Sequence, residues 1–245
     1  ELLQAHMHSI SKGDLEAEVV NYYDEEQRTV RIPLDPQLTP SENAQKYFRK
    51  YQKMKNSLAA VEEQIRQAID EIAYAESLLA QLDGASLEDI DEIREELVEG
   101  GYLRRRGSAR AKRAGKPGRP SLHAYLSSED VPIYVGRNNT QNDYITNRLA
   151  RPNDTWLHAK DMPGSHVLIR SESFGDATLA EAANLAAYFS KGKQSSLVPV
   201  DYTLVRHVKK PSGAKPGFVI YEKQKTLFVT PDEAAIRRLR PLQGS

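Results

Sequence analysis

The chain has 245 residues, of which 39% are hydrophobic and 28% are charged, and it contains no cysteine. This length accommodates one large domain or two small ones. A chain without cysteine has no disulfide framework, no thiol nucleophile and no zinc site that depends on thiolates. No apolar run reaches the roughly 18 residues of a membrane-spanning helix, and no secretory leader is visible. Because the chain begins at Glu1 rather than Met, we expect a piece of a longer protein. The absence of cysteine fits a cytoplasmic location.

The formal net charge of zero conceals two halves of opposite sign. Residues 1–100 contain ten Lys and Arg against 22 Asp and Glu, and residues 101–245 contain 24 against 12, so the halves carry −12 and +12. Such asymmetry predicts two units with different partners. A basic unit attracts phosphate backbones by counterion release. On charge alone, nucleic-acid binding by the second half and simple solvation of both halves remain alternatives.

Residues 16–34 are expected to form a β-hairpin, because β-branched and aromatic residues flank the turn-rich segment DEEQ. Three prolines then interrupt regular structure. Residues 41–83 contain neither Pro nor Gly and predict one long helix of roughly 65 Å at 1.5 Å per residue. A shorter helix is predicted over residues 86–101, with Ser86 as its N-cap and two glycines at its end.

Apolar side chains recur along the long helix at steps of three and four residues, which is the spacing of a heptad seam. The seam consists of Leu58, Val61, Ile65, Ala68, Ile72, Ala75, Leu79 and Leu82. Such a seam needs a partner helix. Either the chain self-associates through the seam, or the partner helix lies upstream of Glu1.

Residues 104–119, RRRGSARAKRAGKPGR, contain eight basic residues and no acidic residue. Gly, Ala and Pro fill the remaining positions, so we predict a flexible basic linker. It is either a solvated tether or an arm that contacts phosphates.

Residues 131–240 change to a mixed pattern of strands and helices. The few helices beside many strands predict an α+β fold with mostly antiparallel pairing, rather than a doubly wound sheet. Strands are predicted over residues 132–136, 154–160, 166–170, 200–208, 217–223 and 227–230, and helices over residues 141–150 and 177–192.

In the second half, the side chains that best indicate a function lie in the segment DTWLH. Strand alternation places Asp154, Trp156 and His158 on one face and turns their neighbours to the other. One interpretation is a platform in which the indole stacks on a base, the imidazole donates hydrogen bonds and the carboxylate orients it or reads a base edge. The alternative is a half-buried Trp with local hydrogen bonds. The turn that follows brings Lys160, Ser165 and His166 beside this segment.

The segment GRNNTQND, residues 136–143, is rich in side-chain amides that can read base edges or bond phosphates. The same amides can instead close the loop or cap the following helix, with Asn142 or Asp143 as its N-cap. A later loop, KKPSGAKPGF, suits backbone approach to phosphate or a solvated turn, and it contains Lys209, Lys210 and Lys215.

Catalysis is not indicated. Asp154, His158, Asp161 and His166 could in principle hold a metal. However, no metalloprotease, phosphate-loop or nucleophile-elbow pattern occurs, and we predict neither a metal nor another cofactor.

Long motifs of the chain resemble the NFACT family. YVGRNNTQNDYITNRLA, DTWLHAKDMPGSHVLIR, DATLAEAANLAAYFSKGK and HVKKPSGAKPGFVIY are similar to its NFACT-R domain. The upstream residues resemble the coiled-coil middle region of the same proteins, many of whose bacterial members carry the older name fibronectin-binding protein. The resemblance covers nearly the whole chain, and D-x-W-x-H is part of the family's functional signature, intact here as Asp154, Trp156 and His158.

The resemblance implies a ribosome-associated quality-control factor. Such proteins bind a large ribosomal subunit obstructed by peptidyl-tRNA and recruit tRNA, alanyl-tRNA in bacteria, for a C-terminal tail added without mRNA. It also implies a coiled-coil middle region with a hairpin tip over residues 1–101, a basic linker over 102–124 and an RNA-binding NFACT-R domain over 125–245. The seam would pair with a helix absent from this chain.

We therefore predict a non-catalytic, ribosome-associated RNA-binding protein that does not enter a membrane. Fibronectin binding and a scaffold that self-associates through the seam are the competing hypotheses. The predicted RNA-binding residues are Arg137, Asn138, Asn139, Gln141, Asn142, Asp154, Trp156, His158, Lys160, Asp161, Ser165, His166, Lys209, Lys210 and Lys215.

Overall fold

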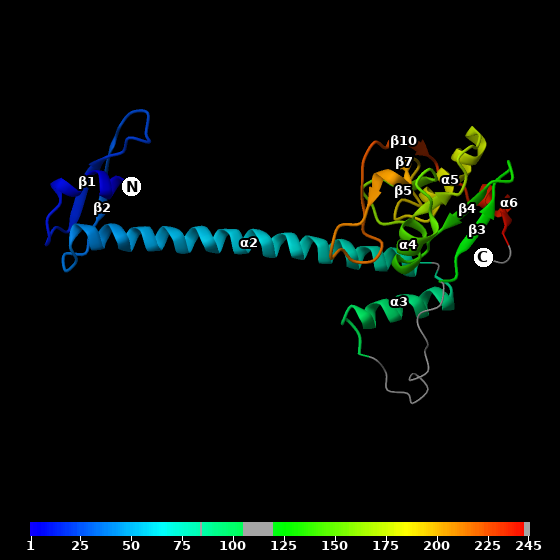
Figure 1. The fold of residues 1–245 in the computed structure, drawn as a ribbon, viewed down its shortest axis with the longest axis horizontal. Helices are drawn as coiled ribbons and strands as arrows, with labels where there is room; N and C mark the ends of the chain where they lie inside the picture. Colours follow the sequence, from blue (N-terminus) through cyan, green and yellow to red (C-terminus); the bar gives the residue numbers. More distant parts are fainter. Residues whose placement is uncertain (84, 105–119, 243–245) are drawn as a thin grey trace. The chain divides into compact units, whose positions relative to one another are not determined.

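The computed structural model describes residues 1–83, 85–104 and 120–242 (Figure 1). The chain forms two compact units, Glu1–Asp70 and Glu71–Ser245. The division falls inside the long helix, whereas the expected boundary lies at residue 101. The last turns of that helix and the whole of the shorter helix therefore belong to the same unit as the large sheet. Most of the basic segment 104–119 lies outside the described residues.

The first unit is built around the expected hairpin. Strands β1 (Glu16–Val20) and β2 (Thr29–Pro33) pair antiparallel. Two short helices, α1 (Leu2–Ala5) and η1 (Met7–Ser9), precede them. A small core holds these elements together, and it comprises Leu3, Ile10, Ala17, Val19 and Leu34.

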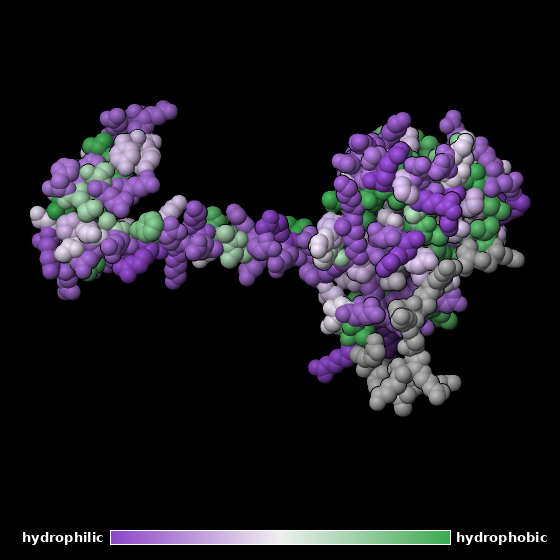
Figure 2. All heavy atoms as spheres, viewed as in Figure 1, coloured by the Kyte–Doolittle hydropathy of each residue, from purple (hydrophilic) through white to green (hydrophobic). Residues whose placement is uncertain are grey.

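Helix α2 (Pro40–Leu82) confirms the long helix. Its seam side chains are solvent-exposed along most of its length: Ile65 is 54% exposed and Ile72 is 61% exposed. In Figure 2, hydrophilic residues cover most of α2 and hydrophobic ones interrupt them. The seam thus has no partner within the described residues.

Helix α3 (Leu87–Glu99) begins at the expected cap. Ser86 accepts a hydrogen bond from the backbone N–H of Asp89, and the Asp89 side chain accepts from the backbone N–H of Ser86, a reciprocal capping box. Ile93 of α3 packs against Tyr74 and Leu78 of α2. This contact lies one residue before the seam positions 75 and 79, so α3 does not cover the seam.

The second unit contains a seven-stranded sheet in the order β10-β7-β5-β6-β4-β3-β11. Every neighbouring pair is antiparallel, which confirms the predicted α+β class. A small separate hairpin, β8–β9, follows β7. The sheet strands are β3 (His123–Leu126), β4 (Pro132–Val135), β5 (Thr155–Ala159), β6 (Val167–Ile169), β7 (Val198–Leu204), β10 (Lys225–Val229) and β11 (Arg240–Pro241).

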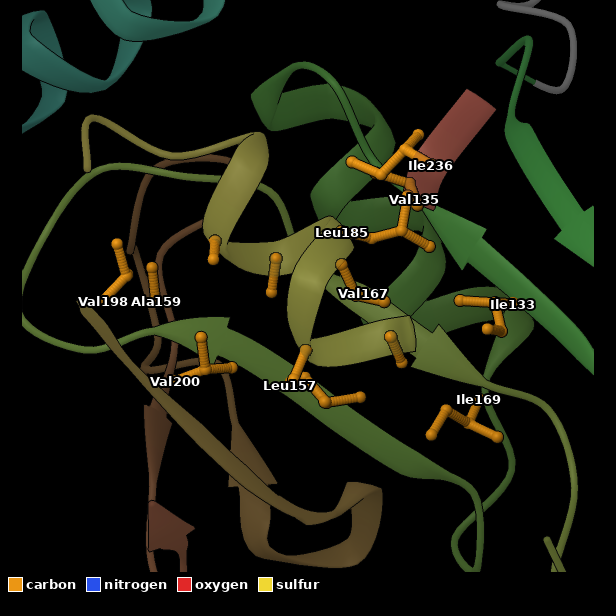
Figure 3. Close-up of a cluster of buried hydrophobic side chains, with 14 residues drawn as sticks. Ile133, Val135, Leu157, Ala159, Val167, Ile169, Leu185, Val198, Val200 and Ile236 are labelled. Atoms are coloured by element: carbon orange, nitrogen blue, oxygen red, sulfur yellow. The ribbon is translucent and has the colours of Figure 1, made fainter. Parts of the chain in front are cut away.

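Helix α5 (Asp176–Tyr188) joins β6 to β7 and covers one face of the sheet. Figure 3 shows the packed side chains, among them Leu157, Val167 and Leu185, between this helix and the strands. All three are fully buried. This core positions β5, because every second residue of β5 points into it.

Short elements complete the second unit. They are α4 (Asn139–Tyr144), the π-helical turn η3 (Ile145–Leu149), η4 (Val205–His207), β8 (Val208–Lys209), β9 (Ile220–Tyr221) and α6 (Glu233–Arg238). Within the described ranges, no helix combines the length and apolar composition of a membrane span.

Candidate nucleic-acid interface

Strand β5 divides its side chains between the two faces of the sheet, as its alternation predicts. Leu157 and Ala159 lie in the core beneath α5. Trp156 and His158 project to the opposite face, where their rings stack with centroids 5.7 Å apart and an interplanar angle of 16°. The expected pairing of these two rings on one face is therefore confirmed.

Trp156 lies at the centre of an aromatic cluster. The edge of His166 meets its indole at 5.0 Å between centroids, and Tyr221 of β9 lies 4.9 Å away. The indole is 0% exposed. The expectation that Trp156 offers an open face to a base is thus wrong in this structure, because protein rings already surround it. His158 and Tyr221 are half-buried and reach the surface instead.

The two histidines of this cluster are neutral at physiological pH. Burial lowers the pKa of His158 to about 4, although Asp201 opposes the shift. Burial and the neighbouring His158 hold the pKa of His166 well below its usual range. The Nδ1 atom of His166 lies 2.8 Å from the hydroxyl of Thr146. These rings can therefore stack and form hydrogen bonds, but they do not supply positive charge.

Asp154 does not act as the acidic partner of His158. Its carboxylate accepts a 2.8 Å hydrogen bond from the backbone N–H of Arg151 and closes the turn before β5. The residue opposite His158 on β7 is Asp201, which accepts hydrogen bonds from Tyr221 at 3.0 Å and Thr226 at 2.6 Å. Sequence reasoning missed Asp201, since strand alternation gives a face but not the register between β5 and β7.

The amides of GRNNTQND have an internal role. Asn138, Asn139, Gln141 and Asn142 are each at most 4% exposed, which favours the alternative that they close the loop and cap the helix. Asn138 is the N-cap of α4, not Asn142 or Asp143, and it accepts from the backbone N–H of Gln141 at 2.8 Å. Asn142 accepts from the backbone N–H of His166 at 2.9 Å.

Three of these amides donate to acidic residues of α3. Asn138 donates to Glu92 at 2.7 Å, and Gln141 donates to Asp89 and Glu92 at 2.9 Å each. Asn139 donates to Glu96 at 3.1 Å. We call this set, the carboxylates of α3 and the amides of residues 138–141, the α3 junction. It joins the helices to the sheet part of the second unit.

The two buried carboxylates of the α3 junction titrate in opposite directions. Burial opposes ionisation of Asp89, but hydrogen bonds from His123, Ser86 and Gln141 outweigh it and lower the pKa. For Glu96, burial prevails and raises the pKa, although Tyr74, Asn139 and Thr140 donate to the carboxylate.

Several predicted phosphate-binding side chains are occupied within the chain. Arg137 lies 3.9 Å from Asp89 and 5.2 Å from the ring centroid of Phe189. Lys210 pairs with Asp143. Lys215 pairs with Glu71 and lies 4.2 Å over the ring of Tyr74.

The remaining predicted residues divide into buried and accessible ones. Ser165 and His166 are at most 4% exposed, so neither side chain presents a surface to RNA in this structure. Lys209 and Asp161 are exposed, and Lys160 is half-buried. Lys160 follows His158 by two residues, and Lys209 lies on β8, which pairs with the strand of Tyr221. Because Lys209 pairs with Ile220 and not with Tyr221, its side chain lies on the other face of that hairpin. We call His158, Tyr221 and Lys160 the His158 surface. No group of three metal-ligating side chains occurs in the described ranges.

Both parts of the chain match profiles of one protein family. Residues 1–116 match the family profile described as NFACT N-terminal and middle domains, and residues 121–222 match the NFACT protein RNA binding domain. The chain belongs to the NFACT family. The α3 junction and the His158 surface both include residues of the RNA-binding match.

Individual relatives agree with this assignment. The chain is 58% identical over 240 residues to a Bacillus subtilis protein named Rqc2 homolog RqcH, covering 98% of the chain and 42% of that protein. It is 32% identical over 81 residues to a Drosophila melanogaster protein named ribosome quality control complex subunit NEMF homolog, covering 32% of the chain and 8% of that protein. The chain thus spans less than half the length of these relatives.

A solved structure is also similar. It is the C-terminal part of the fibronectin/fibrinogen-binding protein from Streptococcus suis, with a TM-score of 0.75 and 46% identity. The similarity covers 82% of this chain and 80% of that one.

Proposed function

We propose that this chain is the RNA-binding part of a ribosome-associated quality-control factor, and that it binds tRNA through the His158 surface. The observation that carries the proposal is the match of residues 121–222 to an RNA-binding domain, because the His158 surface lies inside that range. The names of the bacterial and Drosophila relatives support the ribosomal setting.

The chemistry of the His158 surface suits RNA. A neutral imidazole and a phenol offer ring faces and hydrogen-bonding edges to an unstacked base. Lys160 lies two residues beyond His158, on the same side of the strand by alternation, and can neutralise a phosphate. Trp156 then acts from beneath, by holding the ring of His158 parallel to its own.

We propose the finer function by resemblance to the family. The tRNA is alanyl-tRNA, the larger partner is a large ribosomal subunit obstructed by peptidyl-tRNA, and the outcome is a C-terminal alanine tail added without mRNA. In this scheme the chain positions RNA and performs no bond chemistry of its own, and it works in the cytoplasm.

The test is tRNA binding to this chain across a salt series. His158→Ala should weaken binding by about 1–3 kcal/mol, the usual contribution of one stacked base. Lys160→Gln should reduce the salt slope by about one. Lys193→Gln is the matched control, because Lys193 follows α5 and lies over the ring of Tyr188. Buried Trp156, the sole Trp of the chain, reports folding of each variant by fluorescence.

Unchanged affinity in both His158→Ala and Lys160→Gln would refute the His158 surface as the tRNA site. The name of the Streptococcus suis protein favours a second candidate, fibronectin binding. Fibronectin that binds this chain with a shallow salt slope, and equally well after His158→Ala, would support that candidate.

A further inference from the structure

The hairpin β8–β9 lies against the sheet face that carries His158, although neither of its strands pairs with that sheet. The ring of Tyr221 lies 4.9 Å from the indole of Trp156, and its hydroxyl donates to Asp201 at 3.0 Å. The hydroxyl of Thr203 donates to the backbone C=O of Glu222 at 3.0 Å. The place of Tyr221 on the His158 surface thus depends on side-chain contacts rather than on a strand ladder.

A long loop joins the two strands of this hairpin. Strand β8 ends at Lys209 and β9 begins at Ile220, so the loop has ten residues, 210–219. Two turns close within it, where the N–H of Ala214 donates to Pro211 and the N–H of Phe218 donates to Lys215, at 3.2 Å each. Ordering such a loop is entropically unfavourable, and two-residue strands offer little ladder to offset it. Contacts outside the hairpin must therefore hold the loop.

Lys215, in the middle of this loop, makes the contacts that bind it to α2. Its ammonium pairs with the carboxylate of Glu71 and donates to the hydroxyl of Tyr102. It also lies 4.2 Å from the ring centroid of Tyr74 and 5.0 Å from that of Tyr102. Figure 1 shows the loop, drawn in orange, reaching the last turns of α2. Two ring faces and one carboxylate thus hold a single cation, which strengthens its attachment.

The side chains that hold Lys215 are themselves fixed. Tyr74 is 9% exposed and donates to Glu96 at 2.8 Å, so its ring belongs to the α3 junction. The hydroxyl of Tyr102 donates to Glu71. Burial opposes the charge of Lys215, but its bonds to Glu71 and Tyr102 outweigh this effect and raise its pKa. The attachment is therefore preformed and charged at physiological pH.

The attachment leads along the chain to the RNA site. Tyr221 follows Lys215 by six residues. Between them, Gly217 passes so close to α4 that a Cβ would lie 2.9 Å from Oδ1 of Asn139. The segment from Lys215 to Tyr221 is thus confined along its length, and release of Lys215 from Glu71 would free its first half.

We propose that Lys215 is a positioning residue, which anchors the loop to α2 and thereby holds Tyr221 against Trp156 in the arrangement that binds tRNA. This inference rests on the proposed function of the His158 surface. Lys215 acts indirectly, because its charge is used within the chain and not on a phosphate. It also links α2 to the RNA site, since Glu71 and Tyr74 belong to that helix.

The first test measures tRNA affinity of the whole chain after the carboxylate is removed. Glu71→Ala should weaken tRNA binding at least threefold, because it releases Lys215 and loosens Tyr221. A Lys215 that contacts phosphate predicts the opposite, since the substitution frees its ammonium and makes the chain less negative. Asp70→Ala is the matched control: it removes the same charge from the neighbouring exposed position of α2 and should not weaken binding.

The second test replaces the lysine and uses a salt series. Lys215→Gln should weaken tRNA binding at least threefold with little change in the salt slope, whereas loss of a phosphate contact would reduce the slope by about one. Lys215→Arg keeps a cation that can pair with Glu71 and stack on Tyr74, so its affinity should stay within about twofold of the parent.

The third test measures the local order of the hairpin without RNA. Lys215→Gln and Glu71→Ala should raise acrylamide quenching of Trp156, the sole Trp, at least about twofold. They should also speed hydrogen exchange at residues 217–221, while the amides of β5 and α5 keep their parent rates. Lys209→Gln removes a charge from the same hairpin and should change neither readout, because Lys209 forms no ion pair with any residue in the described ranges.

Unchanged quenching and exchange in both Lys215→Gln and Glu71→Ala would overturn the proposal. Faster exchange throughout β5 and α5 would also overturn it, because Lys215 would then serve overall stability. So would a loosened hairpin that binds tRNA as tightly as the parent while His158→Ala weakens binding. If His158→Ala leaves tRNA binding unchanged, the proposed function fails at this surface, and quenching and exchange still decide whether Lys215 holds Tyr221.

Discussion

Replacing Glu96 tests whether the α3 junction stabilises the second unit. Glu96 is 6% exposed, and its carboxylate accepts from Tyr74 at 2.8 Å, Asn139 at 3.1 Å and Thr140 at 3.2 Å. Glu96→Ala leaves these donors without their acceptor, although Asn139 keeps a 3.2 Å bond to Ser77. A buried donor left unsatisfied costs about 1–3 kcal/mol, so we expect a loss of about 3 kcal/mol in the free energy of unfolding.

Glu96→Gln should behave differently. The amide keeps the size of the side chain and one acceptor oxygen, and the hydroxyls of Tyr74 and Thr140 can turn to accept. It also removes a charge whose burial is unfavourable, as the raised pKa of Glu96 indicates. A raised pKa in the folded state means that this carboxyl favours folding at pH values below its ordinary range, and that this contribution is lost as the pH rises through the raised value. The stability of Glu96→Gln relative to the parent should therefore increase with pH above about 4.5.

The measurement is urea unfolding followed by Trp156 fluorescence, with hydrogen exchange of α3 as a local readout. With a slope of about 2 kcal/mol per molar urea, Glu96→Ala should lower the midpoint by about 1.5 M. Exposed Glu95 is the matched control, and Glu95→Ala should stay within about 0.5 kcal/mol of the parent. A Glu96→Ala variant as stable as Glu95→Ala would refute the stabilising role of the junction. So would a Gln variant that loses as much as the Ala variant at every pH.

Two further predictions concern the second unit. Folding lowers the pKa of His158 to about 4 and also lowers the pKa of His166. The folded state therefore favours the neutral forms of both side chains, so the free energy of unfolding should fall as the pH drops from about 6.5 towards 4. His166→Gln should flatten this acid limb of the unfolding profile, and an unchanged limb would contradict the prediction. Gly217 and Gly213 share a positive φ, +75° and +76° respectively. A Cβ at Gly217 would lie 2.9 Å from Oδ1 of Asn139, whereas a Cβ at Gly213 would meet nothing within 4 Å. Gly213→Ala should cost about 1–2 kcal/mol from the backbone. Gly217→Ala should cost more in thermal unfolding, and equal costs would show that the contact with Asn139 is unimportant.

The sequence predicts those parts of the fold that depend on neighbouring residues. Helix α3 starts at Ser86 because the cap and the residue it bonds lie three positions apart. The uninterrupted length of α2 and the hairpin β1–β2 follow from equally local patterns. The order of the seven strands does not, because it depends on pairing between residues far apart in the chain, such as His158 with Asp201.

The candidate site shows the same limit. Alternation along β5 correctly places Trp156 and His158 together, but burial of Trp156 depends on Tyr221, 65 positions later in the chain. A solvent-facing platform and a buried stack share one local pattern, so the sequence leaves both open. The seam of α2 is another example, since its exposed side chains have a clear period but no partner in the described residues.

The opposite net charges of the two halves find part of their explanation in the second unit. Carboxylates of α2 and α3 lie against the basic and amide side chains that resemble an RNA-binding set, including Arg137, Asn139 and Lys215. The carboxylates of these helices thus form the ion pairs and hydrogen bonds that phosphates of RNA would otherwise form with the same side chains. Of the predicted RNA-binding lysines, Lys210 and Lys215 are paired in this way, whereas Lys160 and Lys209 form no ion pair with any residue in the described ranges. For this reason the net charge of the second half indicates an RNA partner, yet only the pairing of its side chains locates the surface that can meet one.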